Sequence, residues 1–469
     1  MMIFASPKIP LAISFFWLIV AIIENSFLML LSYNDDDLYL LAILVALNFS
    51  AQTFTLYGFK IRLVSFFYAF LAFLYVFHFG QLMTYSLFNE TEFDYSNYIT
   101  AYVERPEIMW KALRVSLFVM NGIFIGGLLA FRKKTIIFTN EKIEAKSNWS
   151  VIKSYGLTLL LISFPFRIYL DVMNFFVSSA LGYGATDKVS IGSGVFSAVA
   201  NFWYLAILLY YFAVKDKYKQ YYCIICVVYM FLTMLSGHRG HQIISIVSLA
   251  IVYIIDNNVK FNLKRTTLGL LLSLVILSFL DIIFAIRGSG FDYLYNHFQD
   301  VINESTKNNI ILETLNDFGG TIYTPYLVID GYGRVFSPFF GECFLKSFVQ
   351  IIPDIGGTFK EINISSIYPK MLNTNHMIGG SFVGEMYYNF GEFYWLFPFF
   401  FGSVMGKFSQ KIELAIMNKR YNQICLYLPF LSYSLWWVRD AVGNFTRPVV
   451  WLLLIYYVVS NLSREKVFR

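Results

Sequence analysis

The stretch GGSFVGEMYYNFG, residues 379–391, closes the longest segment of the chain that is not a plain apolar run. That segment opens after IRGSGF, residues 286–291, and is rich in glycine and proline. Structureless connections longer than about 15 residues are uncommon unless they are functional or disordered. The dense Tyr, Phe and Ile content argues against disorder. We therefore predict that residues 287–389 form a folded, helical cap, with the functional residues where it meets the flanking helices.

The composition of the rest of the chain indicates a membrane protein. Of the 469 residues, 57% are hydrophobic and only 14% are charged, whereas soluble domains have about 25% charged residues. The net charge of +6 is not gathered into a basic stripe, so no nucleic-acid partner is expected. Cys223 and Cys226 form a C-x-x-C pair inside an apolar run without further ligands, so we predict no metal there. Nucleotide-binding motifs are absent, and we predict no cofactor.

Long apolar runs predict the number of membrane-spanning helices. Each span needs about 20 mostly apolar residues, and by this measure the all-α chain has about 12. Nine spans fall in residues 1–286 and three in residues 390–469, on either side of the cap at 287–389. The predicted spans are 11–32, 38–57, 63–87, 110–131, 156–178, 195–214, 221–236, 239–256, 267–286, 390–407, 424–438 and 448–462.

The charges between these spans predict the orientation of the chain. Cytoplasmic loops carry an excess of Lys and Arg. If the N-terminus is cytoplasmic, every inner loop is basic, for example residues 132–153 and 215–219. The acidic loops at residues 35–37 and 90–107 then lie outside. We therefore expect a multi-pass plasma-membrane protein with both termini in the cytoplasm and the cap outside.

Several arginines fall in the predicted outer turns, where the positive-inside rule disfavours them. They lie in SGHRGH (236–241), at the end of the ninth span, and in VRDAVGNFTR (438–447), and they are Arg239, Arg287, Arg439 and Arg447. The guanidinium group binds phosphate through paired, charge-assisted hydrogen bonds. We predict that the four surround an outward-facing cavity and bind pyrophosphate, the alternative being that each anchors its helix at the lipid headgroups.

Histidines and carboxylates supply the remaining candidates. His238 and His241 lie beside Arg239 and are interpreted as glycan-binding or turn-capping rather than metal-binding residues, because a third ligand is missing. His376 and Glu385 lie in the cap close to the next span, and either is a candidate general base. Glu385 is also compatible with a helix-start carboxylate.

Charges inside the predicted spans form a second set. Arg167 and Asp171 are one helical turn apart and are expected to pair. Ionisable residues within spans face the bundle interior or a wet cavity, so this pair either orients helices or contacts substrate. Glu24 and Asp281 also lie within spans.

Three motifs in a fixed order resemble those of the Wzy-type O-antigen polymerases. They are S-G-x-R-G (236–240), G-E-x-Y-Y-N-F-G (384–391) at the end of a long outer segment, and Arg439-Asp440. The resemblance runs from about Phe231 to the C-terminus, while the first half agrees only in hydropathy.

The resemblance implies a GT-C-like, metal-independent membrane glycosyltransferase of the bacterial inner membrane, involved in lipopolysaccharide biosynthesis. Its substrates would be oligosaccharide repeat units linked to undecaprenyl pyrophosphate, and its expected partner a chain-length regulator in the same membrane. Arg239 and Arg439 match the family motifs and would contact phosphate, with Arg287 added by position. Glu385 matches the G-E motif and would act as base or orient the acceptor, with His376 as the alternative.

Three other functions are compatible with some of these sequence features. An O-antigen ligase would share these features. A flippase or other transporter would have cationic residues at the level of both leaflets, and it would not require a large outer cap. A transferase that uses polyprenyl-monophosphate sugars would need a metal-binding acidic motif in the first outer loop, where residues 35–37 lie.

Overall fold

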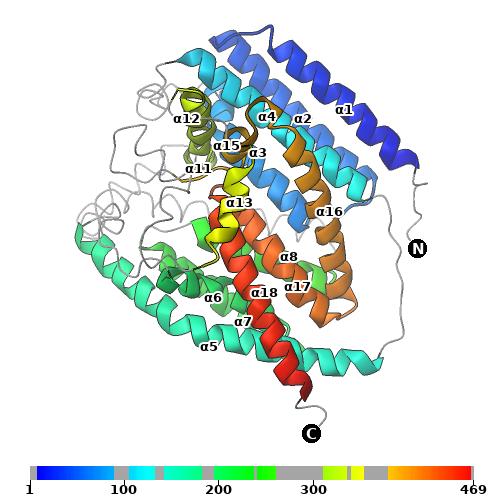
Figure 1. Cartoon of the computed structure of the whole chain (residues 1–469), viewed down its shortest axis with the longest axis vertical. Coiled ribbons are helices and arrows are strands. Elements are labelled where there is room, and N and C mark those ends of the chain that lie inside the picture. The colour runs from blue at the N-terminus through cyan, green and yellow to red at the C-terminus, as the bar shows by residue number, and fades with distance from the viewer. Residues whose placement is uncertain are drawn as a thin grey trace. The chain divides into compact units, whose positions relative to one another are not determined.

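The computed structural model describes residues 8–88, 105–131, 142–181, 195–236, 240–259, 310–334, 340–352 and 379–465, and helices form nearly all of its regular structure (Figure 1). The helices are α1 Lys8–Leu28, α2 Asp35–Gly58, α3 Phe66–Phe88, α4 Pro106–Ala130, α5 Lys142–Leu181, α6 Val195–Tyr211, η3 Asp216–Tyr218, α7 Lys219–Met234, α8 Gly240–Asp256, α11 Ile310–Gly319, η4 Gly320–Ile322, α12 Tyr323–Gly331, α13 Glu342–Val349, α15 Phe382–Phe390, η6 Gly391–Phe393, α16 Leu396–Met417, α17 Tyr421–Trp437 and α18 Val442–Glu465.

The lengths and composition of these helices confirm an all-helical, multi-pass membrane protein. In the described residues, six helices are long and apolar enough to cross a membrane: α1, α2, α3, α4, α5 and α18. The shorter helices α6 and α8 are also apolar. The predicted total of about 12 spans stays a prediction, and the ninth predicted span, residues 267–286, lies outside the described residues.

Several helix boundaries differ from the prediction, among them the start of α5 at Lys142 instead of residue 156, and two of them lie near the candidate site. The tenth span was expected to begin at residue 390, but α15 ends there, Gly391 has φ +53°, and α16 begins only at Leu396. The last span was expected from residue 448, whereas α18 begins at Val442. The amide of Val442 donates to the carboxylate of Glu385, which satisfies a group that a helix start otherwise leaves unpaired. Arg447 therefore lies within α18 and not in the preceding turn.

The chain divides into two compact units, while the predicted division at residues 286 and 389 stays a prediction. One comprises Met1–Ile137, Leu315–Lys411 and Tyr433–Arg447, and the other Phe138–Thr314, Ile412–Ser432 and Pro448–Arg469. In the first unit, α4 packs against α1 and α3, and α2 packs against α3 (Figure 1). Helices from the predicted cap join this packing, because α12 contacts both α4 and α15. Nearly every residue of α12 is buried.

A buried polar group links three of these helices. Glu24 on α1 accepts hydrogen bonds from Asn48 of α2 at 3.1 Å and from Asn121 of α4 at 2.8 Å. Amide side chains that bond across helices stabilise packing within membranes. Glu24 thus has a structural explanation, whereas Asp281 lies outside the described residues.

In the second unit, α5 packs along α6, and α7 and α8 pack against each other and against α6. Lys219, at the start of α7, donates to Asp256 at the end of α8 at 2.6 Å. Tyr211 at the end of α6 donates to the same carboxylate at 2.9 Å. These bonds join the ends of three helices.

Helices α4 and α16 approach so closely that glycine is required at their contact. A Cβ atom on Gly402 would lie 2.2 Å from the carbonyl oxygen of Ile123. We expect Gly402→Ala to destabilise the protein by about 1–3 kcal/mol, because backbone must move to admit the methyl group. Thermal unfolding of the purified protein measures this. Gly58→Ala is the matched control, since nothing lies within 4 Å of that Cβ position. Equal melting temperatures for the two variants would contradict the close approach.

Candidate active site

The G-E motif of the cap lies directly against the turn that contains Arg439. The amide of Phe382, the first residue of α15, donates to the carbonyl of Val438 at 3.2 Å. A Cβ atom on Gly380 would lie 2.5 Å from the carbonyl carbon of Asp440. Only glycine allows two backbones to approach this closely. Two motifs more than 50 residues apart in sequence therefore meet.

Glu385 joins the two motifs from inside the protein. Its side chain is 2% exposed. One oxygen, Oε2, accepts a hydrogen bond from the indole N–H of Trp437 at 2.5 Å, and both oxygens lie 2.9 Å from the amide of Val442. Burial raises the pKa of Glu385 to about 8, although these N–H donors lower it in part. A carboxyl group so enclosed is better placed to hold the turn than to accept a proton from a substrate.

The turn itself is shaped by Asp440. Its Oδ1 accepts from the amide of Ala441 and from the side chain of Asn444, both at 2.7 Å. Burial raises the pKa of Asp440 to about 6, while the bonds from Asn444 and Ala441 lower it. The turn is thus fixed from within by Asp440 and from the cap side by Glu385.

The two arginines of this turn region have different surroundings. Arg439 is half-buried, and its guanidinium carbon lies 5.8 Å from the centre of the Phe77 ring. Arg447 donates from Nε to the carbonyl of Gln350, just past the end of α13, at 2.6 Å. A cation at a helix C-terminus is favoured by the helix dipole. Arg447 therefore joins α13 of the cap to α18, and Arg439 is the better candidate for substrate contact.

His78 is a site residue that the sequence interpretation missed. The hydroxyl of Ser381 caps α15 by accepting from the amide of Gly384 at 3.2 Å, and it lies 2.8 Å from Nε2 of His78. The other ring nitrogen of His78 lies 2.9 Å from the carbonyl of Leu74. Because a carbonyl only accepts, Nδ1 carries the proton and Nε2 accepts from Ser381. The S-x-x-G spacing of Ser381 and Gly384 is visible in the sequence, but nothing in the apolar sequence of α3 indicates that His78 contacts Ser381.

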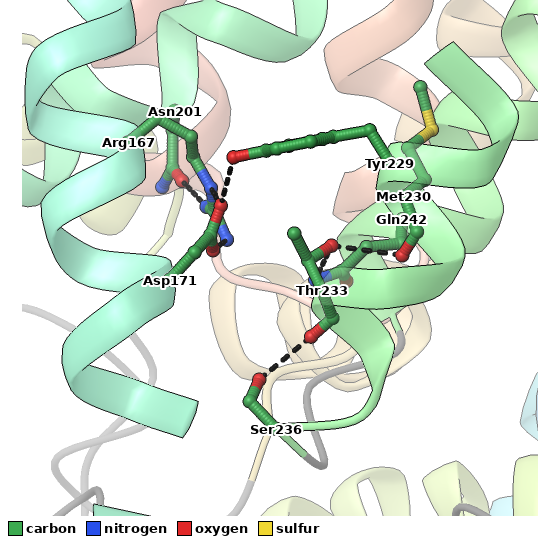
Figure 2. Close-up of polar contacts among 8 residues, drawn as sticks. All are labelled: Arg167, Asp171, Asn201, Tyr229, Met230, Thr233, Ser236 and Gln242. Carbon is green, nitrogen blue, oxygen red and sulfur yellow. Dashed lines mark hydrogen bonds and ion pairs between the residues drawn. The ribbon is translucent and has the colours of Figure 1, made fainter. Parts of the chain in front are cut away.

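The described residues next to residues 237–239 belong to the second unit (Figure 2). Ser236 donates to the carbonyl of Thr233 at 2.8 Å, and Gln242 of α8 donates to the hydroxyl of Thr233 on α7 at 3.4 Å. His241 packs on Tyr204, with ring centres 5.9 Å apart. The hydrogen bond from Gln242 to Thr233 thus joins the start of α8 to the end of α7.

The predicted pair of Arg167 and Asp171 is confirmed in the same unit (Figure 2). Nε of Arg167 donates to Asp171 at 2.9 Å, Tyr229 of α7 donates to the same carboxylate at 2.8 Å, and a further nitrogen of Arg167 donates to Asn201 of α6 at 3.4 Å. The guanidinium also lies 4.9 Å from the ring centre of Tyr204. Every one of these partners comes from α5, α6 or α7, so the geometry favours the helix-orienting interpretation.

The predicted site residues therefore fall into three groups. Glu385, Arg439 and Arg447 lie in one compact unit, and His241 belongs to the other. The remaining four lie outside the described residues: His238, Arg239, Arg287 and His376. Across the part of the chain that the structure describes, no three His, Cys, Asp or Glu residues lie close enough together to hold a metal ion.

Comparison with known proteins adds one finding. A family model described as O-antigen polysaccharide polymerase Wzy matches residues 13–464. The match includes the first half of the chain, where the motifs offered no support. No curated protein and no solved structure matches the chain.

Proposed function

Because the chain belongs to the O-antigen polysaccharide polymerase Wzy family and is therefore a glycosyltransferase-type membrane enzyme, we propose that it joins oligosaccharide repeat units carried on undecaprenyl pyrophosphate. The growing chain passes from its lipid carrier to the non-reducing end of a new lipid-linked unit. The bond between the anomeric carbon and the pyrophosphate oxygen breaks, a bond to the acceptor hydroxyl oxygen forms, and the hydroxyl proton is released. Undecaprenyl pyrophosphate leaves.

The single observation that supports a site for this reaction is the fixed turn at Arg439. Pyrophosphate is already a good leaving group, so the enzyme mainly has to orient the substrates and stabilise the charge that develops on the departing phosphate. A guanidinium group does this best when its backbone is immobile before the substrate binds. The bonds from Phe382 to Val438 and from Val442 to Glu385 hold the turn in place. Arg239 and Arg287 are proposed to contribute further phosphate contacts.

The orientation of the chain belongs to the same proposal. The cap and the Arg439 turn face the outer side of a bacterial plasma membrane, both termini are cytoplasmic, and a chain-length regulator acts as partner. The basic inner loops and acidic outer loops support this orientation. A reaction on the outer face has no access to ATP, and the energy of the sugar–pyrophosphate bond is sufficient without it.

Deletion of the gene in its own host tests this function through a gel of the surface polysaccharide. We expect one repeat unit on each anchor, and a normal ladder when the full chain is restored. Anchors without any repeat unit, while lipid-linked units accumulate outside, would show a ligase instead. Lipid-linked units trapped inside would show a flippase. Either of these results would overturn the polymerase assignment.

A further inference from the structure

Glu392, which follows the G-E motif, has an exposed carboxylate that the buried Tyr387 helps to hold in place. It lies in η6, after Gly391. Its Oε1 accepts hydrogen bonds from Lys111 of α4 at 2.7 Å and from the hydroxyl of Tyr387 of α15 at 2.8 Å. The side chain of Glu392 remains 68% exposed, whereas Tyr387 is 2% exposed. The hydroxyl of the buried Tyr387 thus fixes the position of the exposed carboxylate of Glu392.

This arrangement differs from an ordinary surface ion pair. Exposed pairs contribute little, since two long side chains must be ordered to form them. Here Tyr387 is already fixed by packing, and the ammonium of Lys111 lies 5.2 Å from the centre of its ring. Partial burial raises the pKa of Glu392, but the bonds from Lys111 and Tyr387 and the charge of Arg114 outweigh this and hold that pKa below its ordinary value. Both donors engage Oε1, and within the described residues no hydrogen bond engages Oε2.

The surroundings of Glu392 have the chemistry that binds sugars. The half-buried ring of Tyr332 lies 5.2 Å at centre from the buried ring of Tyr387, and Phe393, which follows Glu392 in sequence, is 61% exposed. Aromatic side chains offer an apolar face next to a polar group. A carboxylate oxygen without a partner accepts a hydrogen bond from a hydroxyl group, and hydroxyl groups are what an oligosaccharide displays in number.

The distance from Arg439 fits the proposed substrate. Helix α15 has nine residues, and its first residue contacts the Arg439 turn while Glu392 follows its last turn. At 1.5 Å per residue, the two ends of α15, one beside the Arg439 turn and the other beside Glu392, lie about 13 Å apart. An oligosaccharide of a few sugars whose pyrophosphate lies at Arg439 spans this length.

We propose that Glu392 is a glycan-binding residue, whose Oε2 accepts a hydrogen bond from a hydroxyl of the lipid-linked oligosaccharide. Lys111 and Tyr387 are positioning residues that hold Oε1. This inference rests on the proposed function, because it takes its ligand from that reaction.

Binding of the free repeat unit tests the inference. The probe is the host's own oligosaccharide repeat unit, released from lipid and pyrophosphate, and its Kd is measured on the purified full chain by calorimetry. We expect Glu392→Gln to weaken binding about 10- to 100-fold, as for loss of one hydrogen bond to a charged group. Lys111→Met keeps the carboxylate of Glu392 but removes one of the two donors that hold its Oε1. It should therefore weaken binding less than Glu392→Gln does. Arg439→Ala should leave this Kd unchanged, because the probe has no phosphate.

A matched variant separates binding from mere loss of a surface ion pair. Glu342 on α13 also pairs with a lysine, Lys346, and is 47% exposed. Glu342→Gln should leave the Kd and the KM for the lipid-linked unit unchanged, whereas Glu392→Gln should raise that KM with little change in kcat. Equal Kd and KM for Glu392→Gln and wild type would overturn the glycan site, with the polymerase assignment intact. A wild-type chain that fails to restore the ladder would instead overturn the proposed function itself.

Discussion

Replacing Arg439 by alanine is expected to leave the surface glycan as single repeat units on the lipid anchor. The guanidinium makes two parallel bonds to one phosphate, and each bond to a charged group contributes about 1.5–3 kcal/mol. Losing both from the transition state slows transfer roughly 10²- to 10⁴-fold. The measurement is a gel of surface polysaccharide from the deletion strain carrying the variant, with the amount of inserted protein checked in parallel. Arg239→Ala is expected to give the same result.

Two further variants show whether paired hydrogen bonding or charge alone matters. Arg439→Lys keeps the charge but not the planar fork, so it should restore only short chains. Arg334→Ala is the control, since Arg334 is 59% exposed and pairs with Asp330, away from the turn. A normal ladder with Arg439→Ala would remove this residue from the mechanism. A full ladder with Arg439→Lys would show that only the positive charge at position 439 is needed.

The sequence predicted the parts of this architecture that depend on local pattern. Runs of apolar residues fix α1 to α5, and the i,i+4 spacing fixes the pair of Arg167 and Asp171. The family motifs also singled out Glu385 and Arg439, each as a candidate site residue. Helix boundaries were less accurate, because the early start of α18 depends on the carboxylate of Glu385, which lies 57 residues away in sequence.

The contacts that sequence reasoning missed are all long-range. His78 and Ser381 are 303 residues apart, and Lys111 and Glu392 are 281 residues apart. No periodicity links such residues. A lysine near the end of a span is typical of a headgroup anchor, so its position alone does not indicate the contact of Lys111 with Glu392. Glu392 was passed over because the predicted span beginning at residue 390 placed it within a helix.

Substitution of Glu385 is expected to have the second large effect, on both stability and polymerisation. Its variants distinguish a positioning residue from a general base. Glu385→Ala leaves the indole N–H of Trp437 and the amide of Val442 buried without partners and adds a cavity. We expect it to destabilise the protein by about 3–5 kcal/mol and to abolish the ladder. Glu385→Gln keeps an oxygen where Oε2 accepts from both donors, so it should fold and polymerise nearly normally. A folded Glu385→Gln protein without polymer would instead indicate a catalytic base.

The pH dependence of stability provides an independent check on the same residue. The pKa of Glu385 rises from an ordinary value of 4.5 to about 8 in the folded protein. Between these values the folded state holds a proton that the unfolded state has lost. The stabilising contribution is therefore complete below pH 4.5 and is lost as the pH rises through 8, with a total on the order of 5 kcal/mol.

Asp440, beside Glu385, titrates in the same direction but with a pKa of about 6, so its contribution is largely lost before pH 7. We therefore expect the melting temperature of the wild type to fall between pH 6.5 and 8.5, and that of Glu385→Gln to stay nearly constant over this range. The two proteins share every other titrating group, so the difference between their curves isolates Glu385. Because glutamine imitates the protonated acid, the variant should match the wild type near pH 4.5 and exceed it increasingly as the pH rises to 8.5. Parallel curves would mean that the carboxyl group is already ionised at neutral pH and that its N–H donors outweigh its burial.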